Sequence, residues 1–372
     1  MNSKSRGYFL WLLFLYLNEL LLHKRFQTND FDGDIGKCNE LYKSTMKISL
    51  QKIITPSISL TVLTYIISLA VWVGAYFQYV NPIPMSGYVG HFAESILSSQ
   101  SLFAHLLGFI MTVLNSLVIM QMNNKYSFIR TRTFMPTFIY LLLSCFWLPV
   151  HGNYVAIIAS FFVLLAIFLI LQMYKDKQAA EQSFLAFFCL AISVFLVPEF
   201  IILILFFWIG FSMLKCLTFR TFFASVIGFV VPWILLYGVL MLAFNQTTLF
   251  PDVSGIIYHY NLFDYTNIPV IVYSGLMFII FSIAMVGLTL NVTRENIQAR
   301  NELVFFRIVA VALILLIIFR FSNITAYLPL VAAVFAILSA YTFTLLKNLF
   351  YSIVFVALCV LTFSFGCYHF FI

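Results

Sequence analysis

The stretch FLAFFCLAISVFLVPEFIILILFFWIGFSMLKCL, residues 184–217, decides the fold class. Its only charged residues are Glu199 and Lys215, and Pro198 interrupts it near the middle. A membrane-spanning helix needs about 20 apolar residues, so this stretch is too long for one span. The residue before a proline also disfavours the helical conformation. We therefore predict two short helices that form a tight hairpin within a membrane.

The composition of the whole chain extends this conclusion. The 372 residues are 63% hydrophobic and 9% charged, with a mean hydropathy of +1.03. A soluble domain is about 45–50% apolar and about 25% charged, so this chain has too few charges to cover a water-facing surface. We expect an integral membrane protein whose main partner is the lipid bilayer.

Apolar segments predict an all-α, polytopic transmembrane bundle of about eleven spans. The hairpin supplies two of them, and the others are separated by short polar loops. The predicted spans are residues 53–78, 102–122, 134–150, 154–173, 184–197, 200–217, 222–244, 268–290, 304–319, 324–346 and 349–370.

The positions of lysine and arginine predict the topology. Cytoplasmic loops carry the excess of basic residues, and 19 of the 20 lysines and arginines lie before the first span or in alternate loops after it. The two longest intervening loops, residues 79–101 and 245–267, contain none. We therefore expect a cytoplasmic N-terminus and an extracytoplasmic C-terminus, with Arg320 as the exception near the extracytoplasmic side.

Residues 1–45 form a separate N-terminal extension ahead of the transmembrane domain at 46–372. Residues 8–22 are apolar but short for a span, and they carry Asn18 and Glu19. A basic flank follows without a small-residue cleavage site, which is unlike a signal peptide. Three interpretations stay open: an interfacial helix, a twelfth span, or an extension from an upstream start codon with Met46 as the first native residue.

The first long extracytoplasmic loop offers candidate catalytic residues. Its apolar residues recur at near-helical spacing, which predicts a short amphipathic helix on the membrane surface. His91 and Glu94, three residues apart, then share one face. That face suits acid–base chemistry or a metal, although two ligands do not complete a metal site; a solvated polar face is the alternative.

The second long loop offers candidate metal ligands. Asp252, His259 and Asp264 lie there among several tyrosines. Carboxylates of this kind can hold a divalent cation that neutralises a substrate phosphate. The alternative is an aromatic belt at the membrane interface with solvating acids.

Two further charged residues lie at predicted helix ends. Glu199 follows Pro198 at a helix start, where a carboxylate complements the helix dipole. Arg320 opposes the charge pattern of its side, and two roles stay open for it. It can extend to lipid headgroups, or it can bind the phosphate of a lipid substrate.

Other functional classes are excluded by the pattern. The chain carries a formal net charge of +7, but the basic residues are dispersed over short loops, so no nucleic-acid partner is expected. The six cysteines lack CxxC spacing and fall mostly in apolar runs, which is typical of small buried hydrophobes rather than of a disulfide framework.

Four stretches together resemble an uncharacterised family of bacterial polytopic inner-membrane proteins, one that is classified as a domain of unknown function. They are LVPEFIILILFFWIGFSML at 196–214, FASVIGFVVPWILL at 223–236, NIQARNELVFFR at 296–307 and LPLVAAVFAILSAYTF at 328–343. The likeness covers residue 47 to the C-terminus and implies a multi-pass protein of the inner membrane. It assigns no catalytic residue.

The general plan is also similar to that of bacterial enzymes that use polyprenyl-phosphate-linked sugars on the outer membrane face, although this first loop has Glu94 alone where such enzymes commonly show paired acids. This likeness favours an outer-face enzyme of glycan or lipid-linked-sugar metabolism, with Glu94 as base or ligand. Two other hypotheses stay open: a small-molecule or lipid transporter built on the Pro198 and Pro232 helices, and a non-catalytic subunit that docks protein partners.

Overall fold

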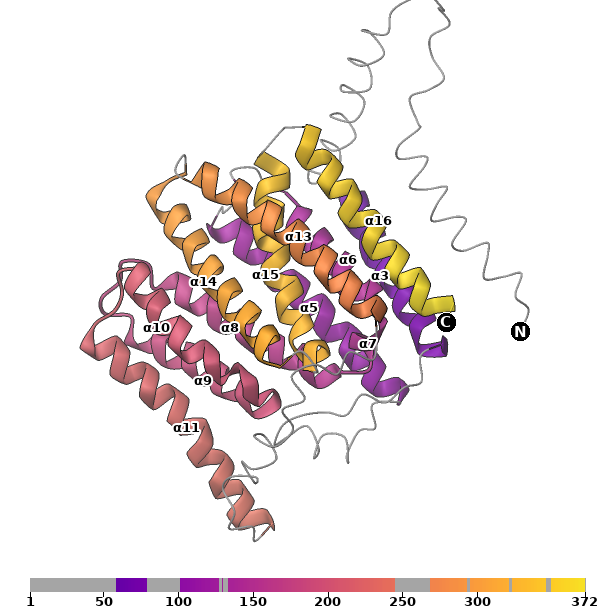
Figure 1. Cartoon of the computed structure of the whole chain (residues 1–372). Helices are drawn as coiled ribbons and strands as arrows, with labels where there is room; N and C mark the ends of the chain where they lie inside the picture. Colours follow the sequence, from indigo (N-terminus) through magenta and orange to yellow (C-terminus); the bar gives the residue numbers. More distant parts are fainter. Residues whose placement is uncertain are drawn as a thin grey trace, which may run out of the picture.

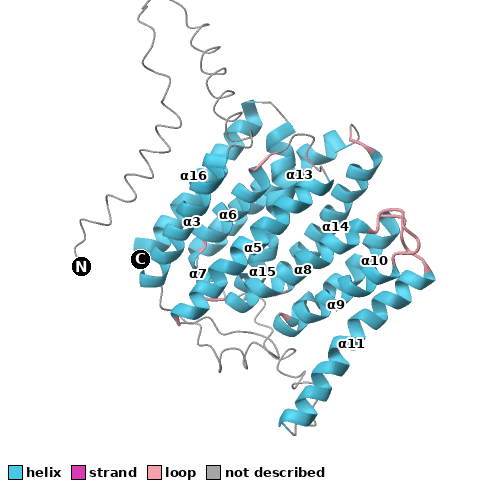
Figure 2. Ribbon diagram, turned by 180° about the vertical axis from the view of Figure 1, so that it is seen from behind, coloured by secondary structure: helices cyan, strands magenta, loops and turns pink. Residues whose placement is uncertain are grey.

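The computed structural model describes residues 58–78, 101–126, 129, 133–244, 268–292, 295–320, 323–345 and 349–371. Within these residues it is all-helical, with eleven α-helices of ten residues or more (Figure 2). Seven of them are long and apolar enough to cross a membrane, and four apolar helices are shorter. The all-α prediction is confirmed, and the protein is a multi-pass membrane protein by the length and composition of these helices.

The helices follow the predicted order along the chain. They are α3 (Ile58–Gln78), α5 (Leu102–Tyr126), α6 (Met135–Phe146), α7 (Leu148–His151), α8 (Tyr154–Gln172), α9 (Ala180–Leu196), the 3-10 helix η1 (Pro198–Ile202), α10 (Leu203–Met213), α11 (Phe219–Phe244), α13 (Ile268–Asn291), α14 (Ile297–Phe319), α15 (Ile324–Leu345) and α16 (Leu349–Phe371).

The long helices run up and down in one bundle around α15 (Figure 1). α15 is the most buried of the seven long helices, and it contacts α5, α6, α8, α13, α14 and α16. At one edge α8, α9 and α11 pack in sequence, with α11 against α9. The apolar core therefore extends along the length of α15, and the peripheral helices leave one face free for lipid.

The two ends of the bundle differ in charge. The Arg320 end holds the last residues of α3, α9 and α14 and the first residues of α5, α8 and α15. The opposite Lys125 end holds six of the eight lysines and arginines in the described ranges, and Arg307 lies in the middle of α14. This segregation is the one that the topology prediction rests on; the orientation in the membrane stays a prediction.

Local sequence explains where the helices stop. The predicted hairpin is present, because α9 ends at Leu196 and η1 begins at Pro198. α8 begins after Asn153, whose side-chain oxygen accepts a hydrogen bond from the Ala156 amide at 3.1 Å. Lys175 and Lys215 follow the ends of α8 and α10 with φ near 60°, the left-handed conformation that commonly ends a helix.

Two predicted spans have different boundaries in the structure. The span predicted at 134–150 is divided into α6 and α7, because Pro149 lacks the amide hydrogen that a continuous helix needs. The span predicted at 304–319 begins seven residues earlier, at Ile297. Four of the residues 297–303 are polar or charged, but the segment still forms a helix. Hydropathy therefore locates the membrane-embedded part of α14 and misses its first turns.

Glycine allows the closest approach between α9 and α11. A Cβ atom added at Gly228 would lie 2.3 Å from the carbonyl oxygen of Phe184. No side chain fits there without moving the backbone, so Gly228 sets the separation of these two helices, as small residues do in membrane proteins.

Candidate functional site

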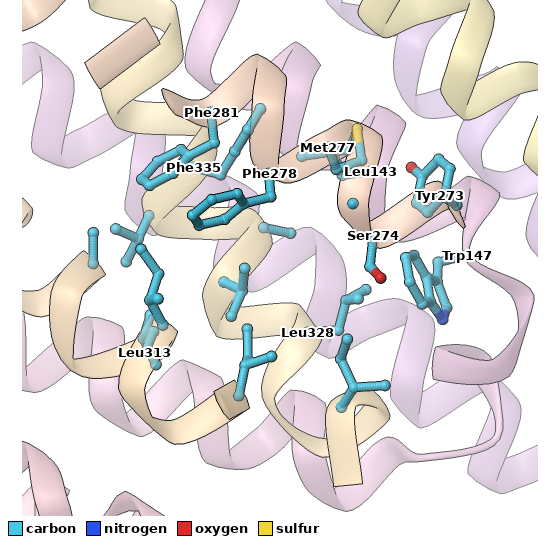
Figure 3. Close-up of a pocket in the computed structure, with 18 of the residues that line it drawn as sticks. Leu143, Trp147, Tyr273, Ser274, Met277, Phe278, Phe281, Leu313, Leu328 and Phe335 are labelled. Atoms are coloured by element: carbon cyan, nitrogen blue, oxygen red, sulfur yellow. The ribbon is translucent and has the colours of Figure 1, made fainter. Parts of the chain in front are cut away.

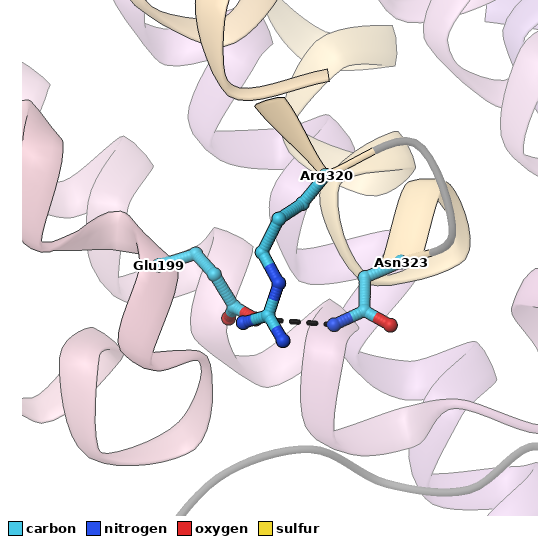
Figure 4. Close-up of polar contacts among 3 residues, drawn as sticks. All are labelled: Glu199, Arg320 and Asn323. Atoms are coloured by element: carbon cyan, nitrogen blue, oxygen red, sulfur yellow. Dashed lines mark hydrogen bonds and ion pairs between the residues drawn. The ribbon is translucent and has the colours of Figure 1, made fainter. Parts of the chain in front are cut away.

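A charged cluster lies at the Arg320 end of the bundle (Figure 4). The guanidinium Nη1 of Arg320 donates to Glu199 Oε1 at 2.6 Å. Asn323 Nδ2 donates to the same carboxylate oxygen at 3.1 Å. The side chains of Glu199 and Arg320 are 9% and 25% exposed, so the ion pair is largely removed from solvent.

Three chain breaks bring these residues together. Glu199 lies in the first turn of η1, directly after Pro198 interrupts the hairpin. Arg320 caps the C-terminus of α14 in an extended conformation, with φ −142°. Asn323 lies just before α15. The cluster therefore joins the α9–α10 hairpin to the α14–α15 hairpin through side chains that are 121 residues apart in the sequence.

The chemistry of this cluster depends on how many donors Arg320 uses. A guanidinium carries five N–H donors in a rigid fork, and the hydrogen bond to Glu199 uses one of its nitrogens, Nη1. The remaining donors are geometrically able to bind a second anion such as a phosphate. The ion pair with Glu199 fixes the orientation of the fork.

An apolar cavity lies between α13 and α14, with α15 and α6 behind it (Figure 3). Its volume is about 520 Å³, within the range of about 300–1,000 Å³ that is typical of ligand pockets. Nearly all of its lining atoms are carbon. The residues that line it include Leu143, Trp147, Tyr273, Ser274, Gly275, Phe281, Leu313 and Phe335.

The cavity occupies the half of the bundle nearer the Arg320 end. On α13 its lining extends from Ile271 to Phe281, which is about 15 Å along a helix and half of a hydrocarbon core of about 30 Å. Trp147, Tyr273 and Ser274 line the part nearest that end, and Phe281 and Phe335 line the deep part (Figure 3). The cavity is thus polar only at one end.

The structure brings together two of the sequence-predicted residues. Glu199 and Arg320 form one ion pair, a contact that neither residue's sequence context indicated. The other five candidates, His91, Glu94, Asp252, His259 and Asp264, lie outside the described residues. The described chain stops at Gln78 and Phe244 and resumes at Ser101 and Ile268, and all four positions are at the Arg320 end.

The described residues hold no group of three or more His, Cys, Asp or Glu side chains that could bind a metal ion. The five cysteines within them are free thiols, and three are buried. The predicted metal ligands Asp252, His259 and Asp264 lie outside the described residues, so the metal site stays a prediction.

A buried histidine pair at the same end was missed by the sequence reasoning. His105 and His151 are 7% and 1% exposed, with ring centroids 6.1 Å apart. The Trp72 ring stacks on His151 at 3.7 Å. Burial, together with the neighbouring His105, lowers the pKa of His151 to about 3, so this imidazole is neutral at physiological pH. The helical spacing of polar residues on α5 and α6 was the signal that points to this region.

Comparison with known proteins gives no match. No family model matches the chain, and neither a curated protein nor a solved structure matches it at a significant level.

Proposed function

We propose that the protein is an extracytoplasmic-face enzyme of glycan or lipid-linked-sugar metabolism in the bacterial inner membrane, and that its substrate has a long apolar chain and a phosphate-containing head. The observation that carries this proposal is the apolar cavity of about 520 Å³ beside α13 and α14. Its length, position and lining fit one lipid chain.

The lining of the cavity favours a lipid chain over a hydrophilic solute. A polar solute in this space would lose its hydrogen bonds to water and find almost no replacement partners, which costs several kcal/mol. A hydrocarbon chain loses nothing of this kind. Because the polar groups of the cavity, on Trp147, Tyr273 and Ser274, gather at the Arg320 end, the chain would enter with its head at that end.

The charged residues at the same end would act on the head. Under this proposal Arg320 uses its remaining donors for the lipid phosphate, and Glu199 holds it in place. Asp252, His259 and Asp264 would bind a divalent cation that neutralises the same phosphate. Glu94, with His91 on the same face, would act as the general base.

The competing hypotheses make different demands on the structure. The transporter hypothesis places a polar cavity beside Pro198 and Pro232, whereas the cavity described above is apolar and lined by α6, α13, α14 and α15. Pro232 lies on α11, which packs against α9 at the edge of the bundle. These positions support the lipid-substrate proposal over a transporter built on those two helices.

The test uses two matched glycine substitutions. A Cβ atom at Gly275, which lines the cavity, or at Gly238 on α11 has no neighbour within 4 Å. Gly275→Leu fills the cavity, and Gly238→Leu adds the same side chain elsewhere. Mass spectrometry then measures polyprenyl-linked and envelope glycans in five strains. One strain lacks the gene for this protein, and the others carry the wild-type gene, Gly275→Leu, Gly238→Leu or Glu94→Gln.

We expect one lipid-linked sugar to accumulate without the gene, with Gly275→Leu and with Glu94→Gln, but not with Gly238→Leu at equal protein level. An unchanged glycan profile without the gene would overturn the proposal. Accumulation with Glu94→Gln but not with Gly275→Leu would overturn the cavity as the site of the lipid chain.

A further inference from the structure

A second internal region, along a neighbouring face of α6, is polar. Polar residues on α6 recur at helical spacing, at positions 137, 140 and 144. Those on α5 recur at 105, 112, 115 and 116. Every member of both stripes is buried, and Tyr140 on α6 faces Asn115 on α5. We call this region the α5–α6 seam; it comprises His105, Thr112, Asn115, Ser116, Thr137, Tyr140, Ser144 and His151.

The seam begins at the Arg320 end with the histidine pair. Trp72 on α3 donates its indole N–H to the carbonyl of His105 at 2.9 Å. The Nε2 atom of His151 lies 3.2 Å from the carbonyl oxygen of Ser144. The first contact is to the backbone of α5 and the second to the His151 ring. One ring nitrogen of each histidine, His105 Nε2 and His151 Nδ1, has no hydrogen-bond partner among the described residues.

The seam ends deeper in the bundle at Asn115. Its Nδ2 donates to the Ile157 carbonyl at 3.3 Å and to Ser160 Oγ at 3.0 Å, both on α8. The Tyr140 hydroxyl lies beside Asn115 and Ser144. His105 and Asn115 are ten residues apart on α5, which is about 15 Å along the helix, so the seam reaches about the middle of the membrane.

Five polar atoms along this path have no hydrogen-bond partner among the residues that the structure describes. They follow one another from the Arg320 end inward: His105 Nε2, His151 Nδ1, Ser144 Oγ, Tyr140 Oη and Asn115 Oδ1. Their residues are 7%, 1%, 2%, 0% and 0% exposed. Among these side chains, the Tyr140 hydroxyl faces Asn115 and Ser144.

Burial of five unsatisfied polar groups in one place is energetically unfavourable. Each buried group without a partner costs about 1–3 kcal/mol, and nearly all buried polar groups in proteins have a protein or water partner. A buried water typically makes about three hydrogen bonds to such groups. Neighbouring orphan atoms on facing helices supply that number of partners.

We propose that the α5–α6 seam is a hydrated inlet, in which a file of bound water molecules extends from His105 and His151 to Asn115. Beyond Asn115 the next turns of α5 place the fully buried apolar side chains of Ile119 and Met122 against the core. Water and protons would therefore reach the middle of the bundle from the Arg320 end. This proposal does not depend on the lipid substrate.

Radiolytic hydroxyl labelling in ¹⁸O-water tests the inlet, because buried side chains are labelled when a bound water lies next to them. The readout is ¹⁸O incorporation at Tyr140 in the full-length protein in detergent or nanodiscs. The matched control is Phe207, an aromatic side chain of equal burial within the apolar core. We expect several-fold more label on Tyr140 than on Phe207. Equal labelling of the two rings would overturn the proposal.

Two variants test whether the seam residues hold the water. Ser144→Ala removes one orphan atom, and Ser144→Ala combined with Asn115→Leu removes the partners on both helices. We expect Tyr140 labelling to fall in the single variant and to reach the Phe207 level in the double variant. If the double variant does not fold, the single variant decides: undiminished labelling of Tyr140 would overturn the proposal.

Discussion

Two neighbouring faces of α6 differ in what they can hold. Leu143 and Trp147 line an apolar cavity of about 520 Å³. Tyr140 and Ser144 belong to the polar seam. Both regions lie in the same half of the bundle, so depth in the membrane does not distinguish them. The polarity of the lining determines whether a region contains water, because an apolar cavity stays dry and a polar one retains water.

The largest expected loss of stability comes from placing a new carboxyl group in each region. The two losses test whether the cavity is dry and the seam is hydrated. Leu313 in the cavity and Ser144 in the seam are both 2% exposed. Leu313→Asp should cost about 4 kcal/mol, because the carboxylate is buried without a partner. Ser144→Asp should cost less than half as much, because the seam provides polar neighbours and water. Thermal unfolding in detergent measures both, and equal losses would mean that the seam is as dry as the cavity.

Adding one methyl group at a glycine tests whether there is free space beside it. Gly228 is packed against α9, and Gly275 faces the cavity. Gly228→Ala should cost about 3 kcal/mol through overpacking, since the new Cβ would lie 2.3 Å from a backbone oxygen of α9. Gly275→Ala should stabilise by about 1 kcal/mol through helix propensity, because its Cβ enters the cavity without a contact. Melting temperatures that shift in the same direction for both variants would contradict the open space beside α13.

The seam also predicts a pH dependence of stability. Burial lowers the pKa of His151 to about 3, whereas an unfolded histidine has a pKa of about 6.5. As pH falls below 6.5, the unfolded chain binds a proton that the folded protein excludes, so stability decreases by at most about 1.4 kcal/mol per pH unit. Melting curves between pH 7.5 and 5.5 should show this loss in the wild type and a smaller one in His151→Gln. The same slope in both proteins would contradict it.

The smallest effect concerns two buried tyrosines. Tyr341 donates its hydroxyl to Glu295 at 3.0 Å, and the Tyr140 hydroxyl has no direct partner among the described residues. Tyr341→Phe should therefore cost about 1 kcal/mol. Tyr140→Phe should cost less, because only hydrogen bonds to water are lost. Chemical denaturation of the two variants gives the order, and a larger loss for Tyr140→Phe would require a protein partner for that hydroxyl.

The membrane architecture was largely predictable from the sequence. Apolar segments located the eleven α-helices of ten residues or more, of which seven are long enough to cross a membrane, and Pro198 marked the break between α9 and η1. Hydropathy missed the polar first turns of α14, because helix formation does not require apolar residues where the chain leaves the membrane. It also missed the division at Pro149, because a proline near a predicted span end does not show whether the helix continues past it.

The candidate site was less predictable, because it depends on which helices are neighbours. Glu199 and Arg320 were each identified alone as notable, but no local pattern indicates that α9 and α14 end side by side. The cavity is equally non-local, since four separate helices line it. The polar stripe at 137, 140 and 144 was visible as helical periodicity, but its partner stripe on α5 was recognisable only after the two helices were placed together.

The ion pair between Glu199 and Arg320 also constrains how the protein is assembled. Glu199 is synthesised 121 residues before Arg320, so at about 5–20 residues per second the wait is on the order of ten seconds. During that interval the α9–α10 hairpin is in the membrane while its carboxyl group lacks the partner that it has in the native protein. Insertion of α14 ends this interval. A nascent chain that stops short of Arg320 therefore keeps an acid at this position without its ionic partner.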